Sequence, residues 1–257
     1  MPDSGRHLWP AAASTALITG LLATTAYGAV ITGTPGNDRI HGKRAGDQIN
    51  ALTGDDVVHA RRGSDTVDLG PGDDRGFGGR GPDTIGGFAG NDRIWGNRGN
   101  DTLRGDLDEV GDTFSRDRLF GGPGADTSFG GDGNDFLAGG FGPDRQQGGA
   151  GDDIVFANQG RDVSEGGEGN DRLFALSLKD VHGPGDTEGD TVHGDGGDDR
   201  IAVRDGERDV VNCGPGIDKA LLDFKDALED GSCEVVSRRA PNRADSRIED
   251  RNEGEQP

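Results

Sequence analysis

The sequence predicts an all-β fold in which short strands and tight turns alternate every nine residues. Three observations support this prediction. An aspartate recurs at intervals of nine residues from 38 to 101 and again from 117 to 171, almost always with a glycine two residues before it and an aliphatic residue two residues after it. Neighbouring side chains on a strand point to opposite faces, so the aliphatic residue should be buried. Each unit is therefore six residues of turn followed by three of strand.

The repeated aspartates are the candidate metal ligands. Calcium is a hard cation that takes carboxylate and backbone carbonyl oxygens, and glycine allows a turn to adopt positive φ and expose its carbonyls. After 171 the spacing loosens, but two further aspartates, at 190 and 199, again lie nine residues apart. The candidate ligands are Asp38, Asp47, Asp56, Asp65, Asp74, Asp83, Asp92, Asp101, Asp117, Asp126, Asp135, Asp144, Asp153, Asp162, Asp171, Asp190 and Asp199.

In six units the turn reads Gly-Gly-x-Gly-x-Asp in full, as in residues 130–135. This turn resembles the RTX (haemolysin-type) calcium-binding nonapeptide, and the resemblance covers residues 33–202. It implies a right-handed parallel β-roll, a β-solenoid with two nonapeptides per coil, and several calcium ions between turns stacked one coil apart. Asp38 would then share ions with Asp56, and Asp47 with Asp65. The alternative, a glycine-rich low-complexity linker, does not account for the aspartate register.

Composition alone points in another direction. Only 30% of the 257 residues are hydrophobic, and the net charge is −21, which is typical of disordered chains. Bound cations would neutralise carboxylates that otherwise repel one another. The same acidity argues against a nucleic-acid partner, whose phosphates would be repelled.

Residues 1–28 have the features of a secretory signal. Residues 11–26 carry no charge, and Ala26-Tyr27-Gly28 places small residues at a cleavage site. The competing interpretation is an uncleaved membrane anchor, but the strongly apolar part, residues 17–22, is short for a bilayer. We therefore expect a mature bacterial protein that is extracellular, free or at the cell surface, without a stable membrane span. Many relatives instead leave through an uncleaved C-terminal signal.

The rest of the chain divides into a roll over residues 29–202, a cap over 203–236 and a disordered tail over 237–257. Residues 105–111 interrupt the repeat, either as an acidic surface loop or as a loop that holds an extra ion. Residues 175–202 are expected to form degenerate coils. Repeat arrays need atypical end units that cover the last exposed core, which is the role expected of the cap.

Cys213 and Cys233 are the only cysteines, and both lie in the expected cap. An isolated pair in an exported protein favours a disulfide over two free thiols. It would close a loop of about 20 residues and stabilise the protein by about 3 kcal/mol on the chain-entropy model.

The sequence contains no His-Glu-x-x-His zinc motif and no Gly-x-Ser-x-Gly elbow. Residues 76–81 match Gly-x-Gly-x-x-Gly, but no helix pattern follows, and the nonapeptide period explains the glycines. We therefore expect no enzymatic activity and predict a structural, adhesive or interaction module that folds on calcium. The alternative is an RTX-type exoenzyme or toxin fragment that acts on an envelope polysaccharide through the roll.

One pattern lies outside the glycines and aspartates. With two units per coil, alternate units build opposite sheets, and the last residue of each unit should point outward. On one sheet, rings occupy this position in every coil except at Ala138, and arginines often stand two positions earlier. Two interpretations remain open: a self-stacking ladder, or a docking face for a cell-envelope glycan or another roll. The ring-bearing residues are His41, His59, Phe77, Trp95, Phe120, Phe156 and Phe174.

Overall fold

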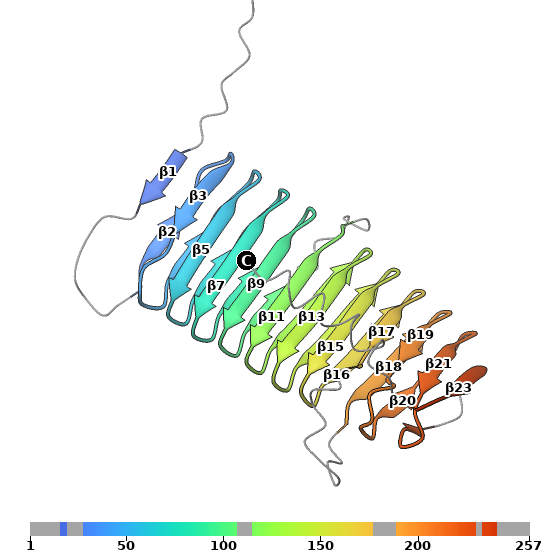
Figure 1. Ribbon diagram of the computed structural model, residues 1–257. Helices are drawn as coiled ribbons and strands as arrows, with labels where there is room; N and C mark the ends of the chain where they lie inside the picture. The colour runs from blue at the N-terminus through green and yellow to red at the C-terminus, as the bar shows by residue number, and fades with distance from the viewer. Residues whose placement is uncertain (1–15, 20–27, 107–114, 177–188, 230–232, 241–257) are drawn as a thin grey trace, which may run out of the picture.

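The computed structural model describes residues 16–19, 28–106, 115–176, 189–229 and 233–240. These residues form two parallel β-sheets of twelve and eleven strands, and successive strands alternate between the two sheets (Figure 1). Each strand therefore pairs with the strand one coil before it and one coil after it. The predicted all-β solenoid, with alternate units in opposite sheets, is confirmed. The described residues form no helix that could cross a membrane.

The strands are short, as the six-plus-three unit predicts. The twelve-stranded sheet consists of β1 (Ala16–Thr19), β3 (Asp38–His41), β5 (Val57–Arg62), β7 (Arg75–Arg80), β9 (Arg93–Arg98), β11 (Arg118–Pro123), β13 (Phe136–Phe141), β15 (Ile154–Gln159), β17 (Arg172–Phe174), β19 (Arg200–Ala202), β21 (Lys219–Leu222) and β23 (Val235–Arg238). The eleven-stranded sheet consists of β2 (Val30–Thr32), β4 (Gln48–Asn50), β6 (Thr66–Asp68), β8 (Thr84–Gly86), β10 (Thr102–Arg104), β12 (Thr127–Asp132), β14 (Arg145–Ala150), β16 (Val163–Glu168), β18 (Thr191–Gly196), β20 (Val210–Asn212) and β22 (Ala227–Leu228).

The register between paired strands shows which coils contain more than 18 residues. Ile40 pairs with Val58, two nonapeptides further along the chain, and most later coils keep this offset. The offset is longer between β9 and β11, where Ile94 pairs with Leu119. The insertion expected at 105–111 therefore leaves the stacking phase intact; residues 107–114 themselves lie outside the described part.

A second interruption follows β17. Leu173 pairs directly with Ile201, so the segment between them is longer than one coil needs. The sequence predicts degenerate coils over 175–202, and the described part of this segment forms β18 and β19 in the ordinary register. The middle of this segment, residues 177–188, lies outside the described part of the chain.

The core is a column of the middle residues of the strands. Ile40, Ile94 and Leu119 are fully buried, and a buried aliphatic residue recurs in nearly every coil. In β12, β14 and β16 of the eleven-stranded sheet this position is polar, with Ser128, Gln146 and Ser164. Gln146 Nε2 donates to the carbonyl oxygen of Phe156 at 2.8 Å, and Ser164 Oγ donates to Gln146 Oε1 at 3.0 Å. Buried polar groups need such partners.

The two ends of the chain extend the same sheets. At the C-terminal end, β20 to β23 continue the alternation through the segment expected as a cap, 203–236. Cys213 and Cys233 form a disulfide with their Cα atoms 5.3 Å apart, so this prediction is confirmed. At the N-terminal end, β1, from the segment expected as a secretory signal, pairs in parallel with β3. Residues 241–257, most of the expected tail, lie outside the described part.

Candidate metal centre

The repeat aspartates form two buried ladders, one along each row of turns. In each ladder the Oδ1 atom of an aspartate accepts a hydrogen bond from the backbone N–H of the aspartate one coil earlier. Asp38 N lies 2.6 Å from Asp56 Oδ1, and Asp117 N lies 2.8 Å from Asp135 Oδ1. Asp92 N reaches Asp117 Oδ1 across the first insertion at 2.8 Å. The expected stacking of candidate ligands one coil apart is therefore present.

The second carboxylate oxygen, Oδ2, has no hydrogen-bond partner in most rungs, although it is buried. A carboxylate oxygen buried without a partner costs free energy, because it has lost water and gained nothing in return. Such atoms call for a cation or a proton. The residues with an unsatisfied Oδ2 are Asp56, Asp65, Asp74, Asp83, Asp101, Asp117, Asp126, Asp135, Asp144, Asp153, Asp171 and Asp199, together with Asp209 and Asp218 further along the chain.

The first glycine of the turn leaves room beside this oxygen. A Cβ atom built on Gly78 would lie 2.5 Å from Asp83 Oδ2 and 2.8 Å from the carbonyl oxygen of Gly96, one coil later. Any other residue at Gly78 would fill the space into which these two oxygens point. A carboxylate oxygen and a backbone carbonyl oxygen that converge on a small space are the ligand types that calcium prefers.

Burial raises the pKa of the ladder carboxyls far above their ordinary value. It raises the pKa of Asp56 and Asp65 to about 6, and that of Asp144 and Asp153 to about 8. The pKa of Asp117 rises to about 9, first through burial and then through the neighbouring aspartates of the ladder. Without a cation, much of the ladder would have to hold protons at neutral pH. The donor set therefore fits several hard divalent ions.

The first rung of each ladder differs. Asp38 Oδ2 accepts a hydrogen bond from Thr34 N at 2.5 Å, and Asp47 Oδ2 accepts one from Lys43 N at 2.5 Å. These two predicted ligands are thus already bonded within their own turns, unlike the aspartates of the following coils.

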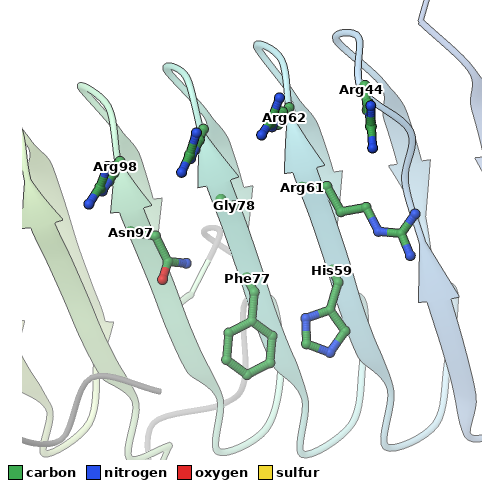
Figure 2. Close-up of a pocket in the computed structure, with 10 residues that line it drawn as sticks. Arg44, His59, Arg61, Arg62, Phe77, Gly78, Asn97 and Arg98 are labelled. Carbon is green, nitrogen blue, oxygen red and sulfur yellow. The ribbon is translucent and has the colours of Figure 1, made fainter.

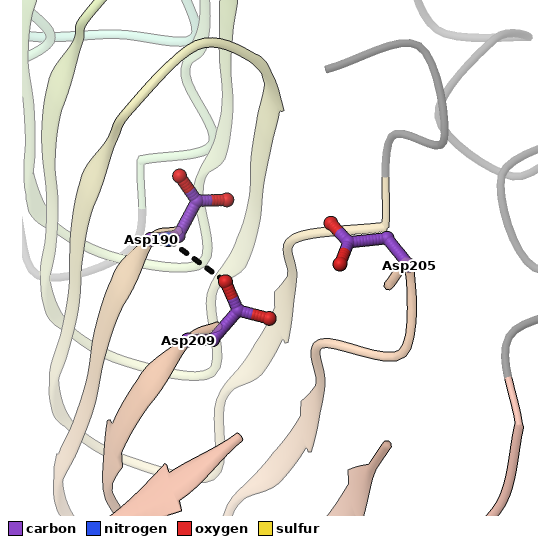
Figure 3. A group of neighbouring side chains, drawn as sticks. All are labelled: Asp190, Asp205 and Asp209. Atoms are coloured by element: carbon purple, nitrogen blue, oxygen red, sulfur yellow. Dashed lines mark hydrogen bonds between the residues drawn. The ribbon is translucent and has the colours of Figure 1, made fainter. Parts of the chain in front are cut away.

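The ladders also run further than the sequence predicted. Asp190 N donates to Asp209 Oδ1, and Asp199 N donates to Asp218 Oδ1, each at 2.8 Å. Asp209 and Asp218 lie nine residues apart, and Asp218 follows a Gly-Pro-Gly turn. This spacing indicates further ladder positions within the segment expected as a cap. Asp205 joins the end of one ladder, where ligand atoms of Asp190, Asp205 and Asp209 lie within 4.8 Å of one another (Figure 3). Burial raises the pKa of Asp205 and Asp209 strongly.

The rings predicted to share a face do stack in register on the outer side of the twelve-stranded sheet. The His59 and Phe77 centroids lie 4.5 Å apart and the Phe77 and Trp95 centroids 4.6 Å apart, with interplanar angles of 10° and 3°. The stack continues through all seven predicted residues, and Phe136 fills the gap beside Ala138. Trp95 and Phe120 lie on the same sheet despite the insertion between them.

The exposure of this stack is uneven. Phe120 is 1% exposed and Phe156 is 5% exposed, and with Ala138 they form a second small apolar cluster outside the roll's core. His41, His59, Phe77 and Trp95 remain half-buried. The self-stacking ladder is therefore real. Its N-terminal part and Phe174 at the other end remain open enough to contact a partner, whereas Phe120 and Phe156 do not.

Comparison with known proteins supports the metal assignment. Five segments of the chain, 32–67, 68–103, 113–146, 138–173 and 185–207, match the family model described as RTX calcium-binding nonapeptide repeat. Together they span more than half of the chain and coincide with the aspartate ladders. No curated protein matches the chain.

Proposed function

Because the chain belongs to the RTX calcium-binding nonapeptide-repeat family, we propose that it is a secreted, non-enzymatic module that folds outside the cell when calcium fills its ladders. The observation that carries this proposal is the set of buried Oδ2 atoms without partners, repeated coil after coil. The folded roll would then serve as a structural or adhesive surface at or near the cell envelope.

The ladder residues would hold the ions. Where the first turn residue is glycine, as at Gly78, Gly96 and Gly130, the aspartate Oδ2 and a backbone carbonyl oxygen of the next coil are the nearest oxygens to the space that the glycine leaves. Calcium supplies positive charge at that space and removes the need for the carboxyl to hold a proton. The site requires two neighbouring coils, so the unfolded chain lacks it, and the binding free energy becomes folding free energy.

The charge of the chain supports the same sequence of events. A net charge of −21 keeps a metal-free chain expanded and soluble during export. Calcium outside the cell is abundant enough for sites of millimolar affinity, which is the range typical of extracellular modules. The disulfide between Cys213 and Cys233 is in keeping with an oxidising compartment.

A calcium titration followed by circular dichroism tests this proposal. In chelator at neutral pH, the chain lacking residues 1–28 should show little β signal, and calcium should restore β signal and compaction together. Magnesium should substitute poorly, because it demands tight octahedral geometry and retains its waters. A β signal that is unchanged by excess chelator would contradict the proposal.

The proposal that the module has no enzymatic activity is tested separately. The calcium-folded protein is incubated with envelope polysaccharides, and both phases are analysed. Retention of the protein on the polymer without new reducing ends is expected. Release of shortened chains would instead show that the roll is an enzyme.

A further inference from the structure

A groove on the outer face of the twelve-stranded sheet is lined by five arginines and by no carboxylate. It lies over β5, β7 and β9 and has a volume of about 830 Å³ (Figure 2). Two rings of the stack, His59 and Phe77, form its floor, and Asn97 lies beside them. The arginines are Arg44, Arg61, Arg62, Arg80 and Arg98. This is an unusual concentration of positive charge in a chain whose net charge is −21.

Four of these arginines, all except Arg61, form a regular row. They occupy the same position of the turn in four successive coils, and all four are exposed. None of their guanidinium groups makes an ion pair or a hydrogen bond with another described residue. Successive strands lie about 4.8 Å apart, so four like charges are held at this spacing along one edge of the groove. They repel one another and gain free energy when an anion lies along them.

Apart from the buried ladder aspartates, the turns that carry this row contain no acidic residue. The residue before the ladder aspartate is Gly46, Ser64, Pro82 and Asn100 in the turns that carry the arginines. In the opposite row of turns, the same position holds Asn37, Asp55, Asp73 and Asn91. The Asn37 and Asn91 amides donate to Asp55 and Asp73, and the backbone N–H of Asp73 donates to Asp55 Oδ1. In the first coils, the position before the ladder aspartate thus carries exposed acids only in the opposite row of turns.

Arg61 adds a second kind of observation. Its φ is +86°, in the left-handed region, and its partner in the next coil is Gly79. A glycine at position 61 would adopt this conformation without strain, whereas an arginine does so at a cost of about 1 kcal/mol. The second turn position has positive φ in other coils too, as at Leu52 and Asn97, so the strain belongs to the turn of the repeat and Arg61 tolerates it with an exposed, charged side chain.

The floor presents ring edges to the groove. His59 is stacked between His41 and Phe77, so the faces of its ring are already covered. The edge of an aromatic ring carries partial positive charge and therefore suits an anion. Burial is the main cause that lowers the pKa of both His41 and His59; the charges of two arginines follow at His41, and those of His41 and the same arginines follow at His59. Both imidazoles therefore favour the neutral form in a surrounding positive field.

We propose that this groove binds a linear acidic polysaccharide that carries one carboxylate on each sugar. The row supplies one guanidinium per coil, about 4.8 Å apart, which is close to the advance of a chain by one pyranose unit. Each guanidinium can hold a carboxylate through two parallel hydrogen bonds. Sugar hydroxyls would lie over Asn97 and the ring edges.

Two features favour this ligand over a nucleic acid. Phosphates along one strand of a duplex advance about 3.4 Å per nucleotide along the helix axis, which does not match the coil spacing. Single strands bind chiefly by stacking bases on aromatic faces, and the faces in this stack are occupied. This inference rests on the proposed function, because the groove exists only in the folded roll.

The test measures binding of a short galacturonate oligomer to the calcium-folded protein, with free calcium held at the lowest concentration that completes folding in the titration and kept the same for every oligomer and variant. Circular dichroism of the same samples reports folding. The methyl ester of the oligomer, which has the same ring without the charge, should bind at least about tenfold more weakly. A folded protein that binds neither would overturn this inference alone, whereas a chain that calcium does not fold would fail the proposed function instead.

Matched variants assign the binding to the row. Arg62→Gln with Arg80→Gln should weaken binding at least about tenfold, while Arg161→Gln with Arg208→Gln, which removes two other exposed arginines, should leave it unchanged. Arg61→Gly should weaken binding and leave the calcium-folded protein at least as stable as before. Equal losses from both pairs, or equally tight binding of a single-stranded oligonucleotide of the same charge, would contradict the proposal.

Discussion

The first coils and the later coils of the twelve-stranded sheet share the same ladders but use their outer face differently. In the first four coils, the third position of one row of turns is arginine and the neighbouring rings are half-buried. In the following coils, this position holds Pro123, Phe141 and Gln159, and the rings of Phe120 and Phe156 are buried. One half of the face is an open, charged groove and the other half is a second apolar cluster.

The difference shows that the repeat fixes one set of positions and leaves another free. The ladder aspartates, and the glycine two residues before most of them, recur in both halves. On this sheet, the third residue of the turn and the last residue of the strand belong neither to the aspartate ladders nor to the column of buried aliphatic residues. They can therefore become either a binding surface or a packing surface without altering the coil.

The largest expected effect is that of pH on the metal-free roll. Burial raises the pKa of Asp56 and Asp65 from 3.8 to about 6, and that of Asp117 to about 9. The folded state then binds more protons than the unfolded chain, so stability is greatest at low pH and is lost as pH rises. In chelator, the contribution of Asp56 and Asp65 should be lost by about pH 6, whereas the coils around Asp74 and Asp117 should continue to lose stability up to about pH 8 and about pH 9, respectively.

Hydrogen exchange in chelator at a series of pH values resolves the two regions. Saturating calcium should flatten the dependence in both, since the ions replace the protons. Protection that rises with pH in the metal-free protein would have the opposite sign and would disprove this account.

The two halves of the ring stack should respond differently to loss of a ring. Phe156→Ala empties a buried site and should cost about 3–5 kcal/mol of unfolding free energy. Phe77→Ala removes a half-buried ring and should cost about 1–2 kcal/mol. Denaturant unfolding in saturating calcium measures both. Equal costs would mean that the two halves of the face are packed alike.

A single ladder position should matter more than a charge elsewhere. Asp135→Ala leaves the backbone N–H of Asp117 without its partner and removes a candidate ligand, so it should cost about 2 kcal/mol and weaken calcium binding. Asp68→Ala removes the same charge outside the ladders and should do little. Isothermal titration with calcium compares them. Equal shifts would show that overall charge, rather than the ladder, governs binding.

The smallest effect concerns the strain at Arg61. Arg61→Gly should stabilise the roll by about 0.5–1 kcal/mol, because relief of a left-handed arginine exceeds the extra entropy that glycine brings to the unfolded chain. Arg62→Gly, at a position without positive φ, should destabilise by a similar amount. Thermal unfolding in calcium measures both, and a loss of stability in both variants would argue against strain at Arg61.

The fold and the ladders could be predicted because the residue types at fixed positions of the nine-residue unit determine its local structure. A glycine and an aspartate at fixed spacing specify turn, strand and ligand at once, and the phase of the rings followed from two units per coil. The extension of the ladders to Asp209 and Asp218 was missed because extra residues break the count before this pair. The burial of Phe120 and Phe156 could not be read from periodicity either, because Phe136, which packs between them, stands two positions out of phase with the rings.

The two interruptions of the register have a consequence for how such a chain can evolve. Both longer connections still return the next strand to its place in the sheet, so length can be added at a turn without disturbing the neighbours. A duplicated coil would do the same and would lengthen the arginine row by one guanidinium. The number of coils then sets the length of the arginine row, and gain or loss of coils by gene duplication or deletion could match the row to a longer or shorter stretch of polymer.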